Sequence, residues 1–276
     1  MRPGGLKTRR YKTANRGGGF LLLLAGIVLG GGLMAFRQGV FTFPTPLLSI
    51  RTAPESTAAP EKGPILQREI TLPGRGYFAL ELGSFDALDS ARALSESYQS
   101  RGAAGYVLEK NGYRVLAAAY AARADAQAVQ TELKARHQVE TRVMEIAWPE
   151  IKIRLSGRQE QLEAFSDAWD ALGQLPDHLF SLSQAVDKKE TDAASALPLL
   201  LSEKETLSAL CSRLRAQFPE GTSREAEKLS WALDSLVSAL DAARQAQSAV
   251  RLGARIKYCQ LQSICLTAAL TEGMGV

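Results

Sequence analysis

The sequence contains two copies of one strand–helix unit, and this duplication constrains the possible folds more than any other feature. Apolar residues of the first copy recur 35 positions later: Phe78, Leu80, Leu82, Phe85, Ala91, Leu94 and Tyr98 coincide with Tyr113, Val115, Ala117, Tyr120, Ala126, Val129 and Leu133. Alternation at the start of each copy indicates a half-buried strand, and the wider spacing that follows indicates a helix.

Two such halves predict a βαββαβ order. This order gives an α+β, ferredoxin-like domain with a four-stranded antiparallel sheet and both helices on one face. The opposite sheet face is then expected to be open. We expect strands near 77–82, 106–108, 113–117 and 142–146, with a hairpin turn at Asn111-Gly112 and the first helix ending at Gly102.

A stretch without charged residues precedes this domain. Residues 17–36 form 20 consecutive uncharged positions, which is long enough for a helix to cross a bilayer. Residues 1–16 are a basic tail, so the positive-inside rule predicts a cytoplasmic N-terminus and an extracytoplasmic remainder of the chain. A cleaved signal peptide is the competing interpretation, but its apolar region would be shorter.

Residues 37–73 hold six of the eleven prolines, among Thr, Ser, Ala and Glu. Because proline fixes φ and removes a donor, this composition predicts an extended linker rather than a folded domain. The predicted domain then occupies residues 74–147.

Residues 148–276 form the last predicted domain. A short strand is expected at 151–155, followed by an all-α helical bundle of three or four helices. We expect helix from 158 to 172 with an interruption at Gly173–Pro176, a second helix near 202–217, and a long helix from Ser223. One stripe on that long helix is expected to be core, or alternatively to seat a partner helix: Leu229, Leu233, Leu236, Val237 and Leu240.

The charge distribution argues against a nucleic-acid partner. The net charge is +4, but six basic residues lie within positions 1–18, and the rest of the chain carries 27 basic against 29 acidic residues. Three cysteines and two histidines do not supply a metal site or a disulfide framework, so we expect no metal, no cofactor and free cysteines. No nucleophile elbow or phosphate-binding loop is present, and we expect no enzyme activity.

The string Tyr77–Phe85, the helix that follows it and the strand Tyr113-Arg114-Val115 resemble the SPOR (sporulation-related repeat) domain over residues 74–147. The order of basic tail, membrane span, Pro-rich linker and domain is also similar to that of many SPOR proteins. The resemblance implies binding to septal peptidoglycan, in particular to glycan strands stripped of stem peptides at division or sporulation sites.

Carried over residue by residue, the resemblance places the glycan-binding positions on the first and third strands: Glu81, Ser84, Arg114, Tyr113 and Tyr77. Arg114 is the strongest candidate, because a guanidinium can bind the lactyl carboxylate of muramic acid with two hydrogen bonds. The sequence departs from the family pattern at two places. Glu81 replaces the usual Gln, and Ala118-Ala119-Tyr120 replaces the usual Gly-Pro-Phe. A simple cross-strand ion pair between Arg114 and Glu81 is the structural alternative.

The sequence therefore predicts a membrane-anchored, extracytoplasmic peptidoglycan-binding protein. Its partners are glycan strands, with division or sporulation proteins as further candidates. The alternative function is a scaffold of a division or sporulation complex that binds no glycan, and a third class is a wall hydrolase seated in residues 150–276.

Overall fold

The computed structural model describes residues 63–246 and 248–273. The predicted basic tail, membrane span and most of the linker lie outside these residues. Within them, no helix combines the length and the apolar character needed to cross a bilayer.

The predicted βαββαβ order is present. Strands β2 (Arg75–Phe85), β3 (Tyr106–Glu109), β4 (Tyr113–Tyr120) and β5 (Arg142–Trp148) form an antiparallel sheet in the order β3-β4-β2-β5. Helices α1 (Leu88–Gln99) and α2 (Arg123–His137) pack on one face. Asn111 and Gly112 both have positive φ, as the predicted hairpin turn requires.

Alternate side chains of β2 belong to two different apolar cores, one on each face of the sheet. Leu80 is buried on the side of α1 and α2, with Phe78 and Leu82 beside it. Tyr77 and Ala79 point to the opposite face and belong to a separate apolar cluster. The predicted alternation of this strand is therefore confirmed, and Phe78, Leu80 and Leu82 share the face toward α1 and α2.

The outer strands extend beyond this sheet as a two-stranded ribbon. Strand β1 (Leu66–Leu72) pairs with β6 (Ile151–Gly157), and their register continues that of β2 with β5, since two residues on each strand separate the pair Leu72–Ile151 from the pair Arg75–Trp148. A proline falls in each gap, at Pro73 and Pro149, and proline cannot donate to the ladder.

Strand β1 lies inside the segment predicted as linker. Six prolines dominated that prediction, but Ile70 and Leu72 alternate and are buried against the helical bundle. The paired residues of β1 and β6 are 79 to 91 positions apart in sequence, so the pairing leaves no local signal.

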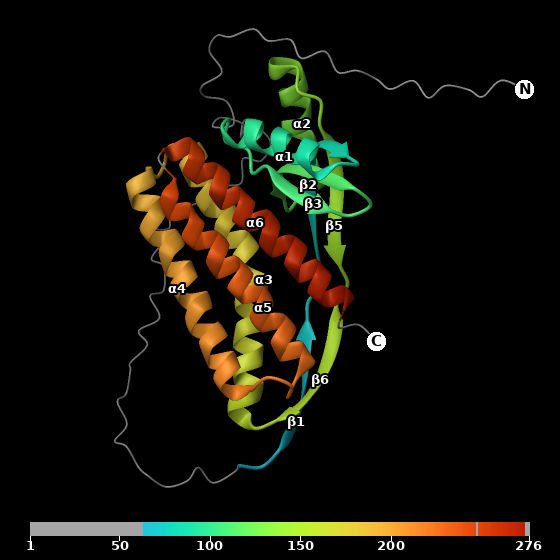
Figure 1. Cartoon of the computed structure of the whole chain (residues 1–276), viewed down its shortest axis with the longest axis vertical. Helices are drawn as coiled ribbons and strands as arrows, with labels where there is room; N and C mark the ends of the chain where they lie inside the picture. Colours follow the sequence, from blue (N-terminus) through green and yellow to red (C-terminus); the bar gives the residue numbers. More distant parts are fainter. Residues whose placement is uncertain (1–62, 247, 274–276) are drawn as a thin grey trace, which may run out of the picture.

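The C-terminal region is a four-helix bundle of α3 (Gln159–Asp187), α4 (Ala193–Gln217), α5 (Arg224–Ala242) and α6 (Ala249–Glu272), with a short 3₁₀ turn, η1 (Ala243–Gln245), before α6. Figure 1 shows α6 running obliquely between the other helices and the strands. The predicted interruption at Gly173–Pro176 is wrong, because α3 continues through it. Pro176 lies on the buried side, where packing offsets the lost hydrogen bond.

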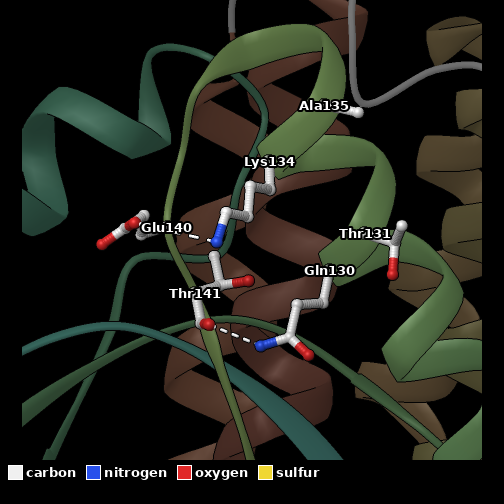
Figure 2. Close-up of a pocket in the computed structure, with 6 residues that line it drawn as sticks. All are labelled: Gln130, Thr131, Lys134, Ala135, Glu140 and Thr141. Atoms are coloured by element: carbon white, nitrogen blue, oxygen red, sulfur yellow. Dashed lines mark hydrogen bonds and ion pairs between the residues drawn. The ribbon is translucent and has the colours of Figure 1, made fainter.

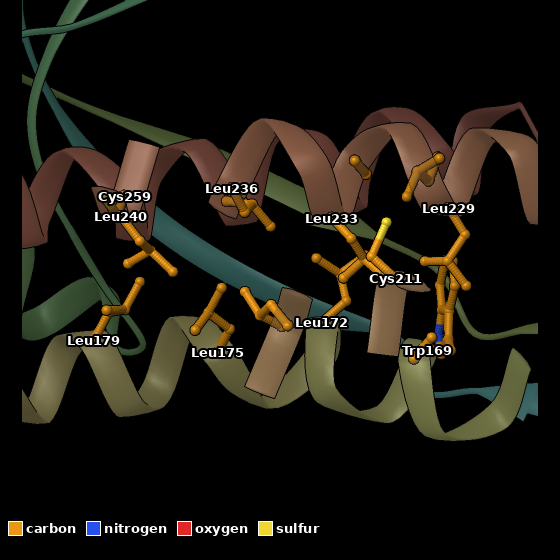
Figure 3. Packing of buried hydrophobic residues seen from close by; sticks show 14 of the residues in the cluster. Trp169, Leu172, Leu175, Leu179, Cys211, Leu229, Leu233, Leu236, Leu240 and Cys259 are labelled. Carbon is orange, nitrogen blue, oxygen red and sulfur yellow. The ribbon is translucent and has the colours of Figure 1, made fainter. Parts of the chain in front are cut away.

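The stripe predicted on the long helix from Ser223, which is α5, forms a large part of the bundle core. Leu229, Leu233, Leu236 and Leu240 are fully buried and face Trp169, Leu172, Leu175 and Leu179 of α3 (Figure 3). A core role of this stripe is thus confirmed. Helix α4 begins at Ala193, earlier than predicted, because Asp192 caps it by accepting a hydrogen bond from the Ser195 backbone N at 2.8 Å.

The expectation of an open sheet face is wrong. Helix α6 packs across the face opposite α1 and α2, where Leu261 and Ile264 are fully buried in one cluster with the sheet residues Tyr77, Ala79, Leu116, Ala119, Ile146 and Trp148. This face is apolar along most of its length, so covering it with a helix removes hydrophobic surface from water.

Polar contacts also join α6 to the sheet domain. Lys257 Nζ donates to the Gly102 carbonyl at 3.1 Å and pairs with Asp187 Oδ2 of α3 at 2.6 Å. Gln260 Nε2 donates to the Ala119 carbonyl at 3.4 Å. The sheet domain and the bundle are therefore packed as one body in this structure.

Replacing Phe165 by alanine should destabilise the protein by about 3–5 kcal/mol, because its ring is completely buried in the bundle core. Trp231→Ala is the matched control: this ring is 61% exposed, and its removal should change stability by less than ~0.5 kcal/mol. Denaturant unfolding measures both. Similar losses for the two variants would contradict the packing described here.

Lys257→Met should destabilise the fold by roughly 2 kcal/mol at pH 7, because it leaves Asp187 partly buried without its cation. Burial already raises the pKa of Asp187 although Lys257 opposes the rise, and losing Lys257 should raise it further. A raised pKa penalises the ionised acid only above its unfolded-state value. The difference from wild type should therefore grow as pH rises from 4 to 7 in denaturant titrations, whereas the exposed Lys188→Met should show no such trend.

Candidate functional site

The five predicted site residues are divided between the two faces and one end of the sheet. Pairing of β2 with β5 is regular from Arg75 to Glu81, so Tyr77 and Glu81 share the face covered by α6. Pairing of β3 with β4 is regular from Tyr113 to Leu116, so Arg114 lies on the same face as Leu116, and Tyr113 lies on the opposite one. We call the side bearing Glu81 and Arg114 the α6 face.

Glu81 and Arg114 form an ion pair on this face, which is the contact that the structural alternative described. Arg114 Nη1 lies 3.5 Å from Glu81 Oε2, and the two side chains are 30% and 8% exposed respectively. Arg114 Nε is buried and has no hydrogen-bond partner among the described residues. The guanidinium therefore has donors to spare and remains partly accessible to solvent, which is the condition for binding a further acceptor.

Tyr77 does not lie free on the α6 face. Its side chain is 3% exposed, its hydroxyl donates to Asp177 Oδ1 of α3 at 3.0 Å, and its ring centroid lies 5.8 Å from that of Trp148. Burial raises the pKa of Tyr77. In this position Tyr77 joins the sheet to the bundle, and its ring is not available to stack on a sugar.

Ser84 and Tyr113 lie together near the Asn111-Gly112 turn. Ser84 pairs in register with Arg114, and Phe85 pairs with Tyr113. Ser84 is exposed and Tyr113 is half-buried. Ser84 is thus a direct cross-strand neighbour of Arg114, whereas strand alternation turns Tyr113 away from it.

The second sequence departure coincides with an irregularity in the sheet. Ala79 pairs with Ala119 and Glu81 pairs with Leu116, so β4 carries an extra residue opposite β2 at Ala117-Ala118. Such a bulge bends the strand and redirects the side chains beside it.

Helix α6 is the element of the site that the sequence analysis missed. Its residues Leu252, Ile256, Cys259 and Leu270 face the bundle core, while Tyr258, Leu261, Ile264, Cys265 and Ala268 face the sheet. The second stripe follows helical spacing and was visible in the sequence. A helix that is apolar on two sides is buried on two sides, so this pattern indicates a second packing partner.

A shallow surface pocket lies elsewhere, between α2 and the start of β5 (Figure 2). Gln130 Nε2 donates to the Thr141 carbonyl at 2.5 Å, and Lys134 lies 4.0 Å from Glu140. Its lining contains no aromatic ring: Gln130, Thr131, Lys134, Ala135, Glu140 and Thr141. The pocket therefore lacks a platform on which a sugar ring can stack.

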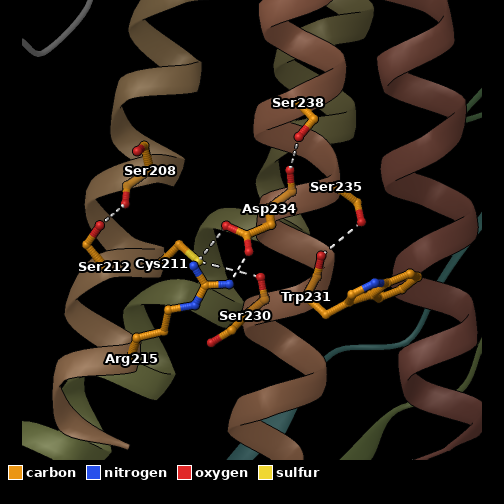
Figure 4. A network of polar contacts seen from close by, with 9 residues as sticks. All are labelled: Ser208, Cys211, Ser212, Arg215, Ser230, Trp231, Asp234, Ser235 and Ser238. Carbon is orange, nitrogen blue, oxygen red and sulfur yellow. Dashed lines mark hydrogen bonds and ion pairs between the residues drawn. The ribbon is translucent and has the colours of Figure 1, made fainter. Parts of the chain in front are cut away.

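The bundle surface carries a network between α4 and α5 (Figure 4). Asp234 forms an ion pair with Arg215 and accepts a hydrogen bond from Cys211 Sγ at 3.2 Å. Burial, with Asp234 adding to it, raises the pKa of Cys211 to about 11, so this thiol is protonated and a poor nucleophile at neutral pH. Within the described ranges no group of three potential metal ligands gathers.

Comparison with known proteins identifies one family. Residues 74–141 match the family model of the SPOR domain. No curated protein and no solved structure matches the chain. The match ends just before β5, the strand that completes the sheet beside β2.

SPOR domains bind peptidoglycan in septal regions. The matched residues include Glu81, Ser84 and Arg114, and they carry the duplicated strand–helix units described above. Residues 74–141 are therefore a SPOR domain within the chain.

Proposed function

We propose that this protein binds septal peptidoglycan through the α6 face of its SPOR domain, from a single membrane anchor at residues 17–36. In this proposal the N-terminus is cytoplasmic and the folded part is extracytoplasmic. The uncharged stretch and the preceding basic tail support the anchor. The family match over residues 74–141 supports the ligand.

The unsatisfied hydrogen-bond donors of Arg114 are the structural observation on which the proposal depends. Its one hydrogen bond to Glu81 is long, its Nε lacks a partner among the described atoms, and its side chain keeps 30% of its exposure. A lactyl carboxylate would take up these donors with two parallel hydrogen bonds. Ser84, exposed beside it, offers a hydroxyl to the same glycan.

The proposal has to account for Glu81 and for α6. An ionised Glu81 accepts hydrogen bonds but repels a muramic acid carboxylate, so its pairing with Arg114 lowers the attraction of the face for glycan. A strand lying along β2 would also meet α6. Glycan therefore binds only those molecules in which this face is accessible. The apparent affinity is the intrinsic affinity multiplied by the fraction of such molecules.

Arg114→Ala should lower retention of the full-length chain on purified sacculi at least about fivefold, because the residue supplies the charged donors for the lactyl carboxylate. Arg114→Lys should retain only part of the binding, since an ammonium lacks the planar fork. Co-sedimentation measures retention, with thermal unfolding as the check that each variant folds. Unchanged retention by a folded Arg114→Ala variant would remove this face as the glycan site.

A scaffold function is the second candidate, and one observation favours it: the α6 face already binds a helix through apolar contacts. In that case the SPOR fold acts as a protein-binding surface, and glycan is not its ligand. The Arg114→Ala variant separates the two. Septal localisation of a fluorescent full-length fusion should be lost with this substitution if glycan binding directs it, and persistence would favour the scaffold.

We further propose that the protein performs no chemistry on the wall. Incubation of the full-length chain with sacculi should release no soluble muropeptides above a buffer control. Release would instead indicate a hydrolase in residues 150–276.

A further inference from the structure

We propose that α6 is an intramolecular occupant of the glycan-binding face, and that the face opens when the whole helical bundle moves away from the SPOR sheet about the break in the ribbon at Pro73-Gly74 and Pro149-Glu150. This inference rests on the proposed function, because it concerns access to the same face. In the closed state α6 covers the face, and in the open state the bundle, with α6, has moved away from it.

Helix α6 should remain with the bundle during this movement. Leu252, Ile256 and Cys259 are buried in the bundle core, and Lys257 pairs with Asp187 of α3 at 2.6 Å. Detaching α6 alone would expose these apolar side chains and break a largely buried ion pair, whereas moving the bundle as a body leaves both intact.

The contact between α6 and the sheet buries fewer apolar side chains of α6 completely than the contact between α6 and the bundle does. Leu261 and Ile264 are its fully buried large aliphatic side chains on α6, and Lys257 and Gln260 hydrogen-bond to carbonyls of Gly102 and Ala119. Two further ion pairs between sheet domain and bundle are partly exposed, Lys110 with Glu272 of α6 and Arg75 with Asp177 of α3. Opening also breaks the hydrogen bond from the Tyr77 hydroxyl to Asp177. Water can replace these polar partners once the surfaces separate.

The ribbon break is suited to act as the hinge. In the described part of the chain, the backbone crosses between sheet and bundle at two points, Pro73-Gly74 and Pro149-Glu150, which lie opposite each other. Neither proline can donate a backbone hydrogen bond to the ladder. The Trp148 indole Nε1 donates to the Pro73 carbonyl at 3.2 Å, so a side chain bridges the break there. A few terminal residues of elements are the usual site of hinge motion.

The three native free cysteines allow this movement to be followed by thiol labelling, so no cysteine has to be introduced. Cys265 packs in the α6–sheet cluster, whereas Cys211 and Cys259 are buried in the bundle core. Burial raises the pKa of Cys265 and Cys259 to about 12, so neither reacts readily in the closed state. Opening should expose Cys265 alone, and unfolding of the bundle should expose all three.

The test uses the full-length chain with Leu261→Glu and Ile264→Glu combined, which places two charges in the α6–sheet contact. Ala269→Glu adds a charge at an exposed position of the same helix and is the matched control. Maleimide labelling with site mapping by mass spectrometry measures opening, and co-sedimentation with purified sacculi measures binding. We expect selective labelling of Cys265 and about tenfold higher sacculus retention for the double variant, both absent in the control. Adding Arg114→Ala should abolish the gain.

Two outcomes would overturn the inference. In the first, the wild type binds sacculi in a way that requires Arg114, and the double variant exposes Cys265 selectively but binds sacculi no better. Glycan binding by this face would then stand, and closure by α6 would not limit it. The other is labelling of all three cysteines, both in the double variant and in the milder Ala268→Glu, because sheet and bundle would then unfold together. Absence of sacculus binding in every form, with selective labelling of Cys265, would reject the proposed function while retaining the movement.

Discussion

The structure depends on the burial of α6 between two apolar surfaces. Leu252, Ile256 and Cys259 complete the bundle core on one side, and Leu261 and Ile264 complete the sheet core on the other. Hydrophobic burial is proportional to area and has no direction, so one helix can serve both cores if it carries two stripes. Without α6, both the bundle and one sheet face would expose apolar side chains to water.

This arrangement changes what the SPOR domain presents to a ligand. The face that carries Glu81 and Arg114 is also the face that packs a helix. Arg114 keeps part of its exposure and an unpartnered buried Nε among the described atoms, while Tyr77 is committed to Asp177 and Trp148. Hydrogen-bond donors thus remain at the Arg114 end of the face, whereas the Tyr77 ring at the other end is buried.

The predicted and observed elements agree where the signal is local. Alternation in Tyr77–Leu82, the Asn111-Gly112 turn and the leucine stripe of α5 each depend on neighbours within a few residues, and all three are present. Two of the failed predictions involve competing local signals. The prolines of residues 37–73 favoured a linker where β1 lies. Gly173 and Pro176 predicted a break in α3, but tertiary packing keeps this helix continuous.

The sequence by itself determined the duplicated βαββαβ domain and the helical character of the C-terminal region, because periodicity and strand alternation are properties of the local backbone. Only the tertiary structure decided that β1 joins β6 and that α6 covers the sheet. Both contacts join residues at least 79 positions apart in sequence. An apolar stripe indicates that a surface is buried, but it does not identify the element that buries it.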